Sequence, residues 1–326
     1  MIPGQQRIKK IYFLLYRALG GEGRIYREIK RRKHVTVLNL HKVGPDSNPY
    51  WSPLHPRRFE DLLRFITARF QVTTFGGLRE ATDDRRPQLI LSFDDGYFDY
   101  LEYAIPLLEK YGLPSNQNVI ADSVRSGQPP ANVRLSEFLG AAPVALIREI
   151  KLPGFTRKLR NESTEEKIAF GNELSRFLKL RPQAEAEAFF KELETVTAKL
   201  DHFETSRMLT VEEIRQIAKR HEIGCHSATH ASMQFESPAF FDEDLKRCMR
   251  FFREELRLPL TAYAFPNGSW RQENLDTLKQ GGIEHVLLVG NGFTTREATA
   301  HKRFNYYADS KSEARLRALG FTSTRA

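Results

Sequence analysis

Short apolar runs alternate with amphipathic segments along most of the chain. Runs with the length of buried strands occur at residues 35–40, 72–75, 88–93, 118–121, 221–225, 263–265 and 285–289. Segments with apolar residues at helical spacing lie between them, at residues 59–70, 101–111, 210–219, 237–256 and 272–279. Such an alternation is typical of an α/β fold, in which a mostly parallel sheet or barrel is joined by right-handed crossovers.

One long stretch interrupts this alternation. Residues 125–207 contain strong helix formers and apolar residues at helical spacing, but no run that resembles a strand. We expect a helical insertion there. Above the strand ends it could act as a lid or as a wall that selects substrates, whereas elsewhere it would only cover the body. Beyond Gly290 the pattern predicts no element, and residues 311–326 are expected to form a basic tail.

Length and composition allow a large core. The chain has 326 residues, of which 40% are hydrophobic, enough for one large α/β domain with an insertion or for two ordinary domains. Its two cysteines, Cys225 and Cys248, are too few for a disulfide framework, and no CxxC pattern is present.

The positive charge lies almost entirely at the N-terminus. Residues 1–33 hold ten basic and two acidic side chains, which account for +8 of the net charge of +9. The remaining chain is nearly neutral and carries no nucleic-acid-binding motif, so we expect no nucleic-acid partner.

The basic segment also has a helical apolar pattern, formed by Ile8, Ile11, Tyr12, Leu15 and Leu19. Its apolar run is too short to span a membrane, and no small-residue cleavage site follows it. We therefore expect a cytoplasmic protein. The basic amphipathic segment, residues 7–33, would either lie on the inner face of an anionic membrane or pack on its own domain.

Two adjacent carboxylates follow the most strongly apolar strand. Asp94 and Asp95 come directly after residues 88–93, and Gly96 then turns the chain. Neighbouring side chains on an extended strand point to opposite faces, so the two acids can share one site only where the strand ends. In α/β folds, ligands bind at the carboxyl ends of the strands, and the pair therefore indicates a working site.

Two histidines follow a later strand. His226 and His230 are four residues apart and would lie on one face if their segment were helical. Because they also follow a strand, we expect them on the same rim as the carboxylates. One carboxylate and two imidazoles suit zinc, cobalt or nickel, with positions left open for water and substrate.

Two further strand ends carry candidate groups. His41 ends the strand at residues 35–40, and the turn at residues 263–268 contains Pro266 and Asn267. A proline turn of this kind can direct a backbone N–H into a site, as the stabilisation of an oxyanion requires.

These motifs together resemble the polysaccharide deacetylase family. Residues 93–96 (FDDG) resemble its first motif, residues 226–230 (HSATH) its second and residues 265–268 (FPNG) a variant of its third. The flanking phrases at residues 105–114 and 221–224 are also similar to family sequence. The similarity covers roughly residues 35–290, apart from the insertion.

The resemblance implies a distorted (β/α) barrel and a metal-dependent site. Asp95, His226 and His230 would bind the divalent metal, most naturally Zn²⁺, with Co²⁺ or Ni²⁺ as alternatives. Asp94 would be the general base, and the backbone N–H of Asn267 would stabilise the oxyanion.

The sequence departs from the family pattern in three places. Tyr263 stands where the family has an arginine that holds the base, and Asn267 stands where an aromatic residue is usual. The Leu-x-x-His motif that usually provides the acid is not evident near the C-terminus. However, residues 38–43 resemble the first strand of circularly permuted members, in which a histidine there is the acid. We therefore assign this role to His41, with His301 as the alternative.

The domain boundaries follow from these assignments. We expect a basic N-terminal segment at residues 1–33, a catalytic domain at residues 34–310 that includes the insertion, and a tail. The expected activity is removal of an N-acetyl group from an amino sugar in a bacterial surface polysaccharide or its lipid-linked precursor. Alternatives are hydrolysis of another acyl amide such as N-formyl, a glycan-binding module without catalysis, and a non-haem iron oxygenase, which the extra Asp94 disfavours.

Overall fold

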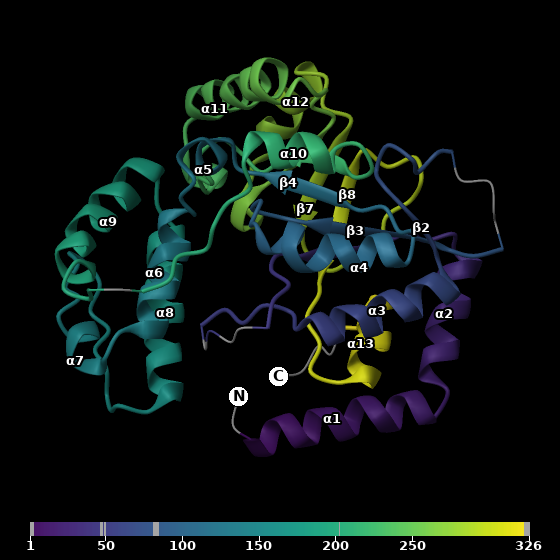
Figure 1. The fold of residues 1–326 in the computed structure, drawn as a ribbon, viewed down its shortest axis with the longest axis horizontal. Helices are drawn as coiled ribbons and strands as arrows, with labels where there is room; N and C mark the ends of the chain where they lie inside the picture. Colours follow the sequence, from purple (N-terminus) through teal and green to yellow (C-terminus); the bar gives the residue numbers. More distant parts are fainter. Residues whose placement is uncertain (1–2, 46–47, 49, 81–84, 202, 323–326) are drawn as a thin grey trace.

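The computed structural model describes residues 3–45, 48, 50–80, 85–201 and 203–322 (Figure 1). A closed barrel of seven parallel strands lies at its centre. Around the barrel the strands follow the order β1 (Thr36–Leu40), β8 (Ala300–Asn305), β7 (His285–Val289), β6 (Ala262–Ala264), β5 (Glu222–Cys225), β4 (Asn116–Val119) and β3 (Gln88–Phe93). Pairing of β3 with β1, from Leu89 opposite Thr36 to Phe93 opposite Leu40, closes the ring. The expected parallel (β/α) barrel is thereby confirmed.

An eighth strand lies beside the ring. β2 (Gln71–Thr73) pairs with the first half of β3, and β4 pairs with the second half at Ser92 and Phe93. The outer faces of the strands pack against helices α3 (Pro56–Arg69), α4 (Ile105–Lys110), α10 (Val211–Ile217), α11 (Pro238–Arg250) and α12 (Gln272–Gln280). A capping box formed by Thr210 and Glu213 opens α10.

The inside of the barrel is apolar at one end and polar at the other. The apolar end holds Val35, Val37, Phe75, Leu78, Ile90, Ala264 and Leu287. At the carboxyl ends of the strands the interior holds buried Ser92, Asn116, Asn118 and Arg303. This polar end is where a site can be built.

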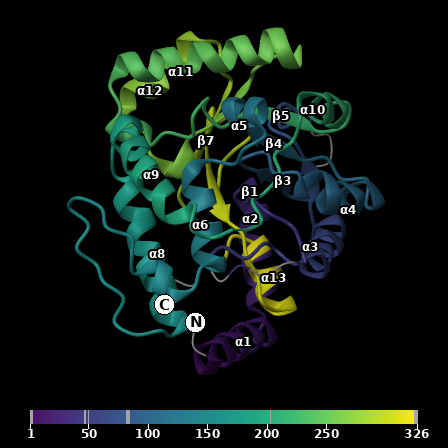
Figure 2. The ribbon, with the colours of Figure 1, turned by 60° about the vertical axis from the view of Figure 1, so that its left-hand side comes forward.

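The insertion is helical, as expected. It consists of α6 (Ala131–Ala141), α7 (Val144–Ile147), α8 (Thr164–Lys179) and α9 (Gln183–Thr197), and it has an apolar core of its own. Figure 2 shows these helices as a layer to one side of the barrel. An ion pair of 3.1 Å between Lys42 and Glu137 joins α6 to the barrel, and the Glu236 carboxylate accepts a bond from the backbone N–H of Gln183.

Two elements near the C-terminus differ from the sequence prediction. β8 was not expected, because its buried positions include His301 and Arg303 and the strand therefore lacks an apolar signal. The expected basic tail is wrong for Lys311–Ala318, which form helix α13. Its Leu316 and Ala318 are fully buried, since one face of this charged helix packs against the body.

The N-terminal segment forms α1 (Pro3–Ala18) and α2 (Gly21–Arg31). One face of α1 packs on the domain: Phe13 is fully buried, and Lys9 pairs with Glu313 at 2.9 Å and Asp309 at 3.2 Å. None of the helices in the described ranges is long and apolar enough to cross a bilayer.

Candidate metal centre and catalytic pocket

The acidic pair lies at the carboxyl end of β3, as the sequence predicts. Asp94 and Asp95 are both almost completely buried. Asp95 and Gly96 have positive φ angles of 79° and 83°, so the backbone turns sharply directly after the strand. Because of this turn, both carboxylates line one cavity of about 360 Å³, which His226 and His230 also line.

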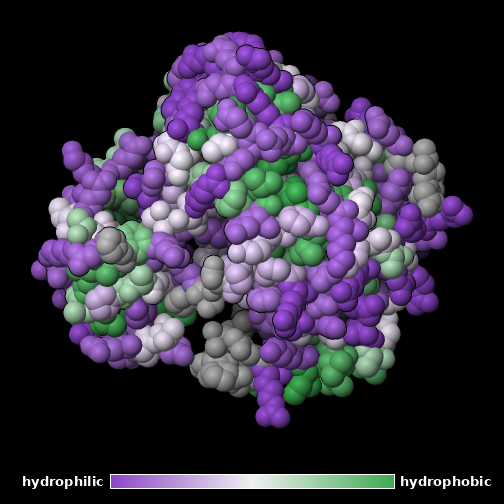
Figure 3. Space-filling model, in the orientation of Figure 1, coloured by the Kyte–Doolittle hydropathy of each residue, from purple (hydrophilic) through white to green (hydrophobic). Residues whose placement is uncertain are grey.

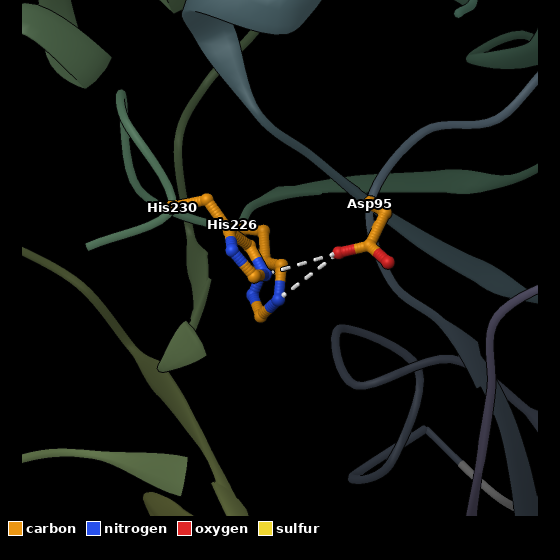
Figure 4. A group of neighbouring side chains, drawn as sticks. All are labelled: Asp95, His226 and His230. Carbon is orange, nitrogen blue, oxygen red and sulfur yellow. Dashed lines mark ion pairs between the residues drawn. The ribbon is translucent and has the colours of Figure 1, made fainter. Parts of the chain in front are cut away.

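Asp95, His226 and His230 form a cluster that can hold a metal ion (Figure 4). Asp95 Oδ1 lies 3.4 Å from Nε2 of His226 and 3.4 Å from Nε2 of His230. One ligand atom from each residue lies within 4.8 Å of the other two. Asp95 follows β3 and both histidines follow β5, so the three ligand atoms approach one point from two strand ends. The side of the cluster that faces the pocket stays open.

The histidine segment is a loop, so its conditional assignment to a helix is wrong. Ser227 and His230 have positive φ angles of 66° and 64°. The Ser227 hydroxyl accepts a hydrogen bond from the backbone N–H of His230 at 2.8 Å, and the buried Asp244 carboxylate accepts one from Ala228 at 2.7 Å. Burial raises the pKa of Asp244 to about 6. These side-chain acceptors take the place of the backbone hydrogen bonds of a helix. The loop that they stabilise directs both imidazoles toward Asp95.

The chemistry of this cluster fits a divalent cation. Asp95 Oδ1 is buried and accepts no hydrogen bond from the residues that the structure describes. Nδ1 of His226 donates to the Ala264 carbonyl oxygen at 2.9 Å, which leaves the lone pair of Nε2 facing Asp95. Burial lowers the pKa of His226 to about 4, so its ring is neutral at pH 7, as a metal ligand must be.

The pKa of Asp95, like that of His226, is lowered. Burial alone would raise this pKa, but the imidazoles of His230, His41 and His226 hold it well below its usual range. An ionised carboxylate without a hydrogen-bond donor on one oxygen is a strong acceptor for a cation.

Asp94 has a different set of partners, and Arg303 is the main one. The guanidinium of Arg303 donates to both carboxylate oxygens, at 2.7 and 2.8 Å. Asn118 donates to Oδ1 at 2.8 Å. Burial would raise the pKa of Asp94, but Arg303, His226 and His41 lower it to about 2. Asp94 is therefore ionised, held in one orientation and kept apart from the metal cluster.

Arg303 was not predicted as a site residue. The sequence showed only that Tyr263 stands where the family has an arginine that holds the base. Arg303 comes from β8, on which His301, Arg303 and Asn305 alternate with Lys302 and Phe304. That alternation is a strand signal, although the barrel interior is polar here and the usual apolar marker is missing.

Asn118 depends on a glycine in the next strand. A Cβ atom added to Gly224 would lie 2.2 Å from Oδ1 of Asn118. Because the Asn118 amide is what reaches Asp94, the backbone of β5 must approach it this closely.

The two candidate acids lie in different places. His41 lines the same pocket as Asp94 and Asp95, and its ring packs edge-on against Trp51 at 5.4 Å between centroids. His301 is fully buried and contacts His285 at 3.1 Å and Thr294 at 3.1 Å. Thr294 pairs with Val35 ahead of β1, so His301 lies toward the amino ends of the strands, away from the pocket.

Asn267 also lines the pocket. It has a φ of 56°, and its side chain donates to the Ser232 hydroxyl at 3.1 Å. The rest of the pocket wall comes partly from the insertion, through Asn132, Asn172, Ser175 and Lys179. The insertion thus contributes directly to the space that a substrate would occupy.

Solved structures share this fold. Deacetylase PplD from Streptococcus pyogenes, solved in complex with acetate, aligns with a TM-score of 0.58 at 13% identity, over 88% of this chain and 98% of its own. IcaB from Ammonifex degensii aligns with a TM-score of 0.55 at 18% identity, over 88% and 97%. The polysaccharide deacetylase BC0361 from Bacillus cereus aligns with a TM-score of 0.56 at 14% identity, over 88% and 69%.

Comparison of sequences finds similarity over a shorter part of the chain than comparison of structures does. No curated protein matches the chain. Residues 182–286 match the sequence model of the polysaccharide deacetylase family. The matched region contains His226, His230 and Asn267, whereas Asp94 and Asp95 lie before it. By this match over residues 182–286 and by its fold, the chain is similar to the polysaccharide deacetylase family.

Proposed function

We propose that this chain is a metal-dependent hydrolase that removes an N-acetyl group from an amino sugar in a bacterial surface polysaccharide or its lipid-linked precursor. One observation carries the proposal: Asp94, oriented by Arg303, faces the same pocket as the Asp95, His226 and His230 cluster. A fixed base beside a candidate cation site is the arrangement that amide hydrolysis by water needs.

The protein's own residues supply the proton transfers. Asp94 accepts a proton from the water that attacks the amide carbon, and Arg303 keeps its carboxylate in place. The divalent ion, when bound, supplies a Lewis acid for the amide carbonyl and for the attacking water. Zn²⁺ is our proposal for this ion, since two imidazoles and one carboxylate suit it; Co²⁺ and Ni²⁺ are the alternatives.

The remaining steps fall to two other pocket residues. The backbone N–H of Asn267 stabilises the tetrahedral oxyanion, and His41 donates a proton to the departing amine as the carbon–nitrogen bond breaks. The products are acetate and a free amino sugar. Because His41 follows β1, ahead of the strand that carries Asp94, we also propose that the chain is of the circularly permuted branch.

Acetate release tests the proposed activity. Purified protein supplied with Zn²⁺ is expected to release acetate from N-acetylated amino-sugar glycans, with one new primary amine for each acetate. Formate release from an N-formylated analogue, without acetate release, would favour the alternative hydrolase. Glycan binding without release of either acid would favour a binding module.

His41→Ala is expected to lower turnover by roughly 10²-fold or more, because the amine then departs without its acid.

The outer face of the N-terminal helix favours a second property, binding to a membrane surface. Leu15, on the side of α1 opposite buried Phe13, exposes 56% of its surface, and Leu19, directly after the helix, exposes 87%. Figure 3 shows hydrophobic atoms gathered where α1 lies in Figure 1. Lys10 and Arg7 lie on the same helix, so the exposed apolar stripe is flanked by positive charge. Packing on the domain and lying on a membrane, the two alternatives expected for residues 7–33, are therefore compatible. One face of α1 packs on the domain, and the other is exposed.

Vesicle binding tests this second proposal. Wild-type protein is expected to sediment with vesicles that contain phosphatidylglycerol, and less with pure phosphatidylcholine. Leu15→Glu/Leu19→Glu should weaken sedimentation at least tenfold, because it places two carboxylates in the apolar face. Leu180→Glu, at a leucine of the insertion that is 53% exposed, is the matched control. Equal sedimentation of all three proteins would contradict membrane binding through α1.

A further inference from the structure

Lys179 lies where the catalytic pocket meets a second cavity. It is the last residue of α8, and its side chain lines both the pocket that holds Asp95 and a neighbouring cavity of about 390 Å³. His230 and Asn267 also line both spaces, so the second cavity adjoins the candidate metal site directly. A substrate larger than the catalytic pocket could therefore reach this cavity past Lys179.

The ammonium of Lys179 lacks a partner within the described part of the chain, where no ion pair or hydrogen bond involves it. Asp94 is already paired with Arg303 through both oxygens. Asp95 pairs with His226 and His230 in the candidate metal cluster, and no ion pair among the described residues joins it to Lys179. Burial lowers the pKa of Lys179, while Asp95 alone opposes this effect. No carboxylate of the pocket is therefore free to pair with this lysine.

The second cavity carries an excess of positive charge. Its basic side chains are Arg134, Lys179, Arg181 and Lys191, and its acidic side chains are Glu187 and Glu194. Arg181 already has partners within the protein. Its Cζ atom lies 3.5 Å from the centroid of the Phe177 ring, and its Nε atom lies 3.8 Å from a carboxylate oxygen of Glu185. Arg134 and Lys191 make no ion pair among the described residues. The cavity therefore offers several cations to whatever occupies it.

From this geometry we propose that the second cavity is a subsite for a diphosphate group of the substrate, with Lys179 as the residue that binds the phosphate nearest the reacting sugar. The inference rests on the proposed function and specifies its substrate class: a glycosyl diphosphate rather than a neutral glycan. A diphosphate carries several acceptor oxygens and more than one negative charge, which matches a group of dispersed cations better than a single carboxylate does. A nucleotide or a polyprenol would be equally suited to carry it.

Kinetics on matched substrates test the subsite. The probes are UDP-N-acetylglucosamine, N-acetylglucosaminyl diphosphoryl polyprenol in detergent, and neutral tetra-N-acetylchitotetraose. Lys179→Gln is expected to raise KM for both diphosphate substrates by about 10- to 100-fold, the effect of losing one charge-assisted hydrogen bond. We expect kcat to change less than about threefold, and KM for neutral tetra-N-acetylchitotetraose to change far less than KM for the diphosphate substrates. Lys179→Arg should restore most of the affinity, since it keeps the charge.

The control variant is Lys199→Gln. Lys199 lies on the same insertion, but it is 57% exposed, pairs with Glu149 and does not line either space. It should behave as the wild type. If Lys179→Gln instead lowers kcat equally on all substrates, Lys179 acts in the reaction itself and the subsite proposal is overturned. Unchanged kinetics in Lys179→Gln would overturn it as well.

Calorimetry with inorganic pyrophosphate separates this inference from the proposed function. The titration is made on metal-loaded protein and repeated after removal of metal ions, because pyrophosphate also binds metals. Binding that persists without metal, weakens tenfold or more in Lys179→Gln and returns in Lys179→Arg supports the subsite even if no deacetylation is found. Metal-free protein that does not bind pyrophosphate overturns the subsite, whatever the activity.

Discussion

Asp94→Asn is expected to abolish turnover while the protein keeps its metal. The amide has no basic oxygen to accept the proton of the attacking water, so turnover should fall by roughly 10³-fold or more. Asp94 is bonded to Arg303 and Asn118, whereas the metal cluster consists of Asp95, His226 and His230. Elemental analysis of protein purified without a histidine tag should therefore find the same metal content as in the wild type.

His230→Ala should lose both the metal and the activity. It removes one of three ligands and leaves too few donors for tight binding. His34→Ala is the control, because His34 stacks on Phe293 at 4.7 Å and precedes β1 at the opposite end of the strands. Activity near the wild-type level in Asp94→Asn or in His230→Ala would contradict the assigned roles. Loss of metal in Asp94→Asn would show that Asp94 is a ligand rather than the base.

The sequence was sufficient to predict where the candidate site residues next to a strong strand signal lie in the fold. Asp94 and Asp95 follow six buried residues, and His226 follows β5, so the rule that sites form at carboxyl ends of parallel strands brings them together. His41 was expected in the pocket for the same reason, and it lines it. These predictions needed only the local pattern and the parallel topology.

Other parts depend on contacts between distant segments. Arg303 reaches Asp94 from a strand 209 positions away, and its own strand has a polar inner face. The HSATH loop is fixed by Asp244 of α11 and by the Ala264 carbonyl, neither of which its own sequence reveals. The position of Lys179 between two cavities likewise depends on how the insertion packs on the barrel. Periodicity cannot show which polar groups the fold will bring together.

Arg303→Met is expected to lower both the stability and the activity of the protein. It leaves the Asp94 carboxylate buried without its bidentate partner, and breaking a buried ion pair in this way costs about 3–5 kcal/mol of unfolding free energy. Without Arg303, burial should raise the pKa of Asp94 from about 2, although His226 and His41 still oppose part of this effect. Because the base works in its ionised form, the acid limb of the pH–rate profile should move to higher pH. Turnover should fall by roughly 10²-fold or more, since the base is also less firmly held.

A double variant separates the stability effect from the catalytic one. In Asp94→Asn/Arg303→Met neither charge remains, so part of the lost unfolding free energy should return although activity does not. Arg303→Lys keeps a charge but cannot donate to both oxygens in parallel, and its turnover should lie between those of Arg303→Met and the wild type. Denaturant unfolding and acetate release measure the two effects on the same proteins. If Arg303→Met were as stable and as active as the wild type, Arg303 could not be what holds the base, and Asn118 would be left as the donor that orients Asp94.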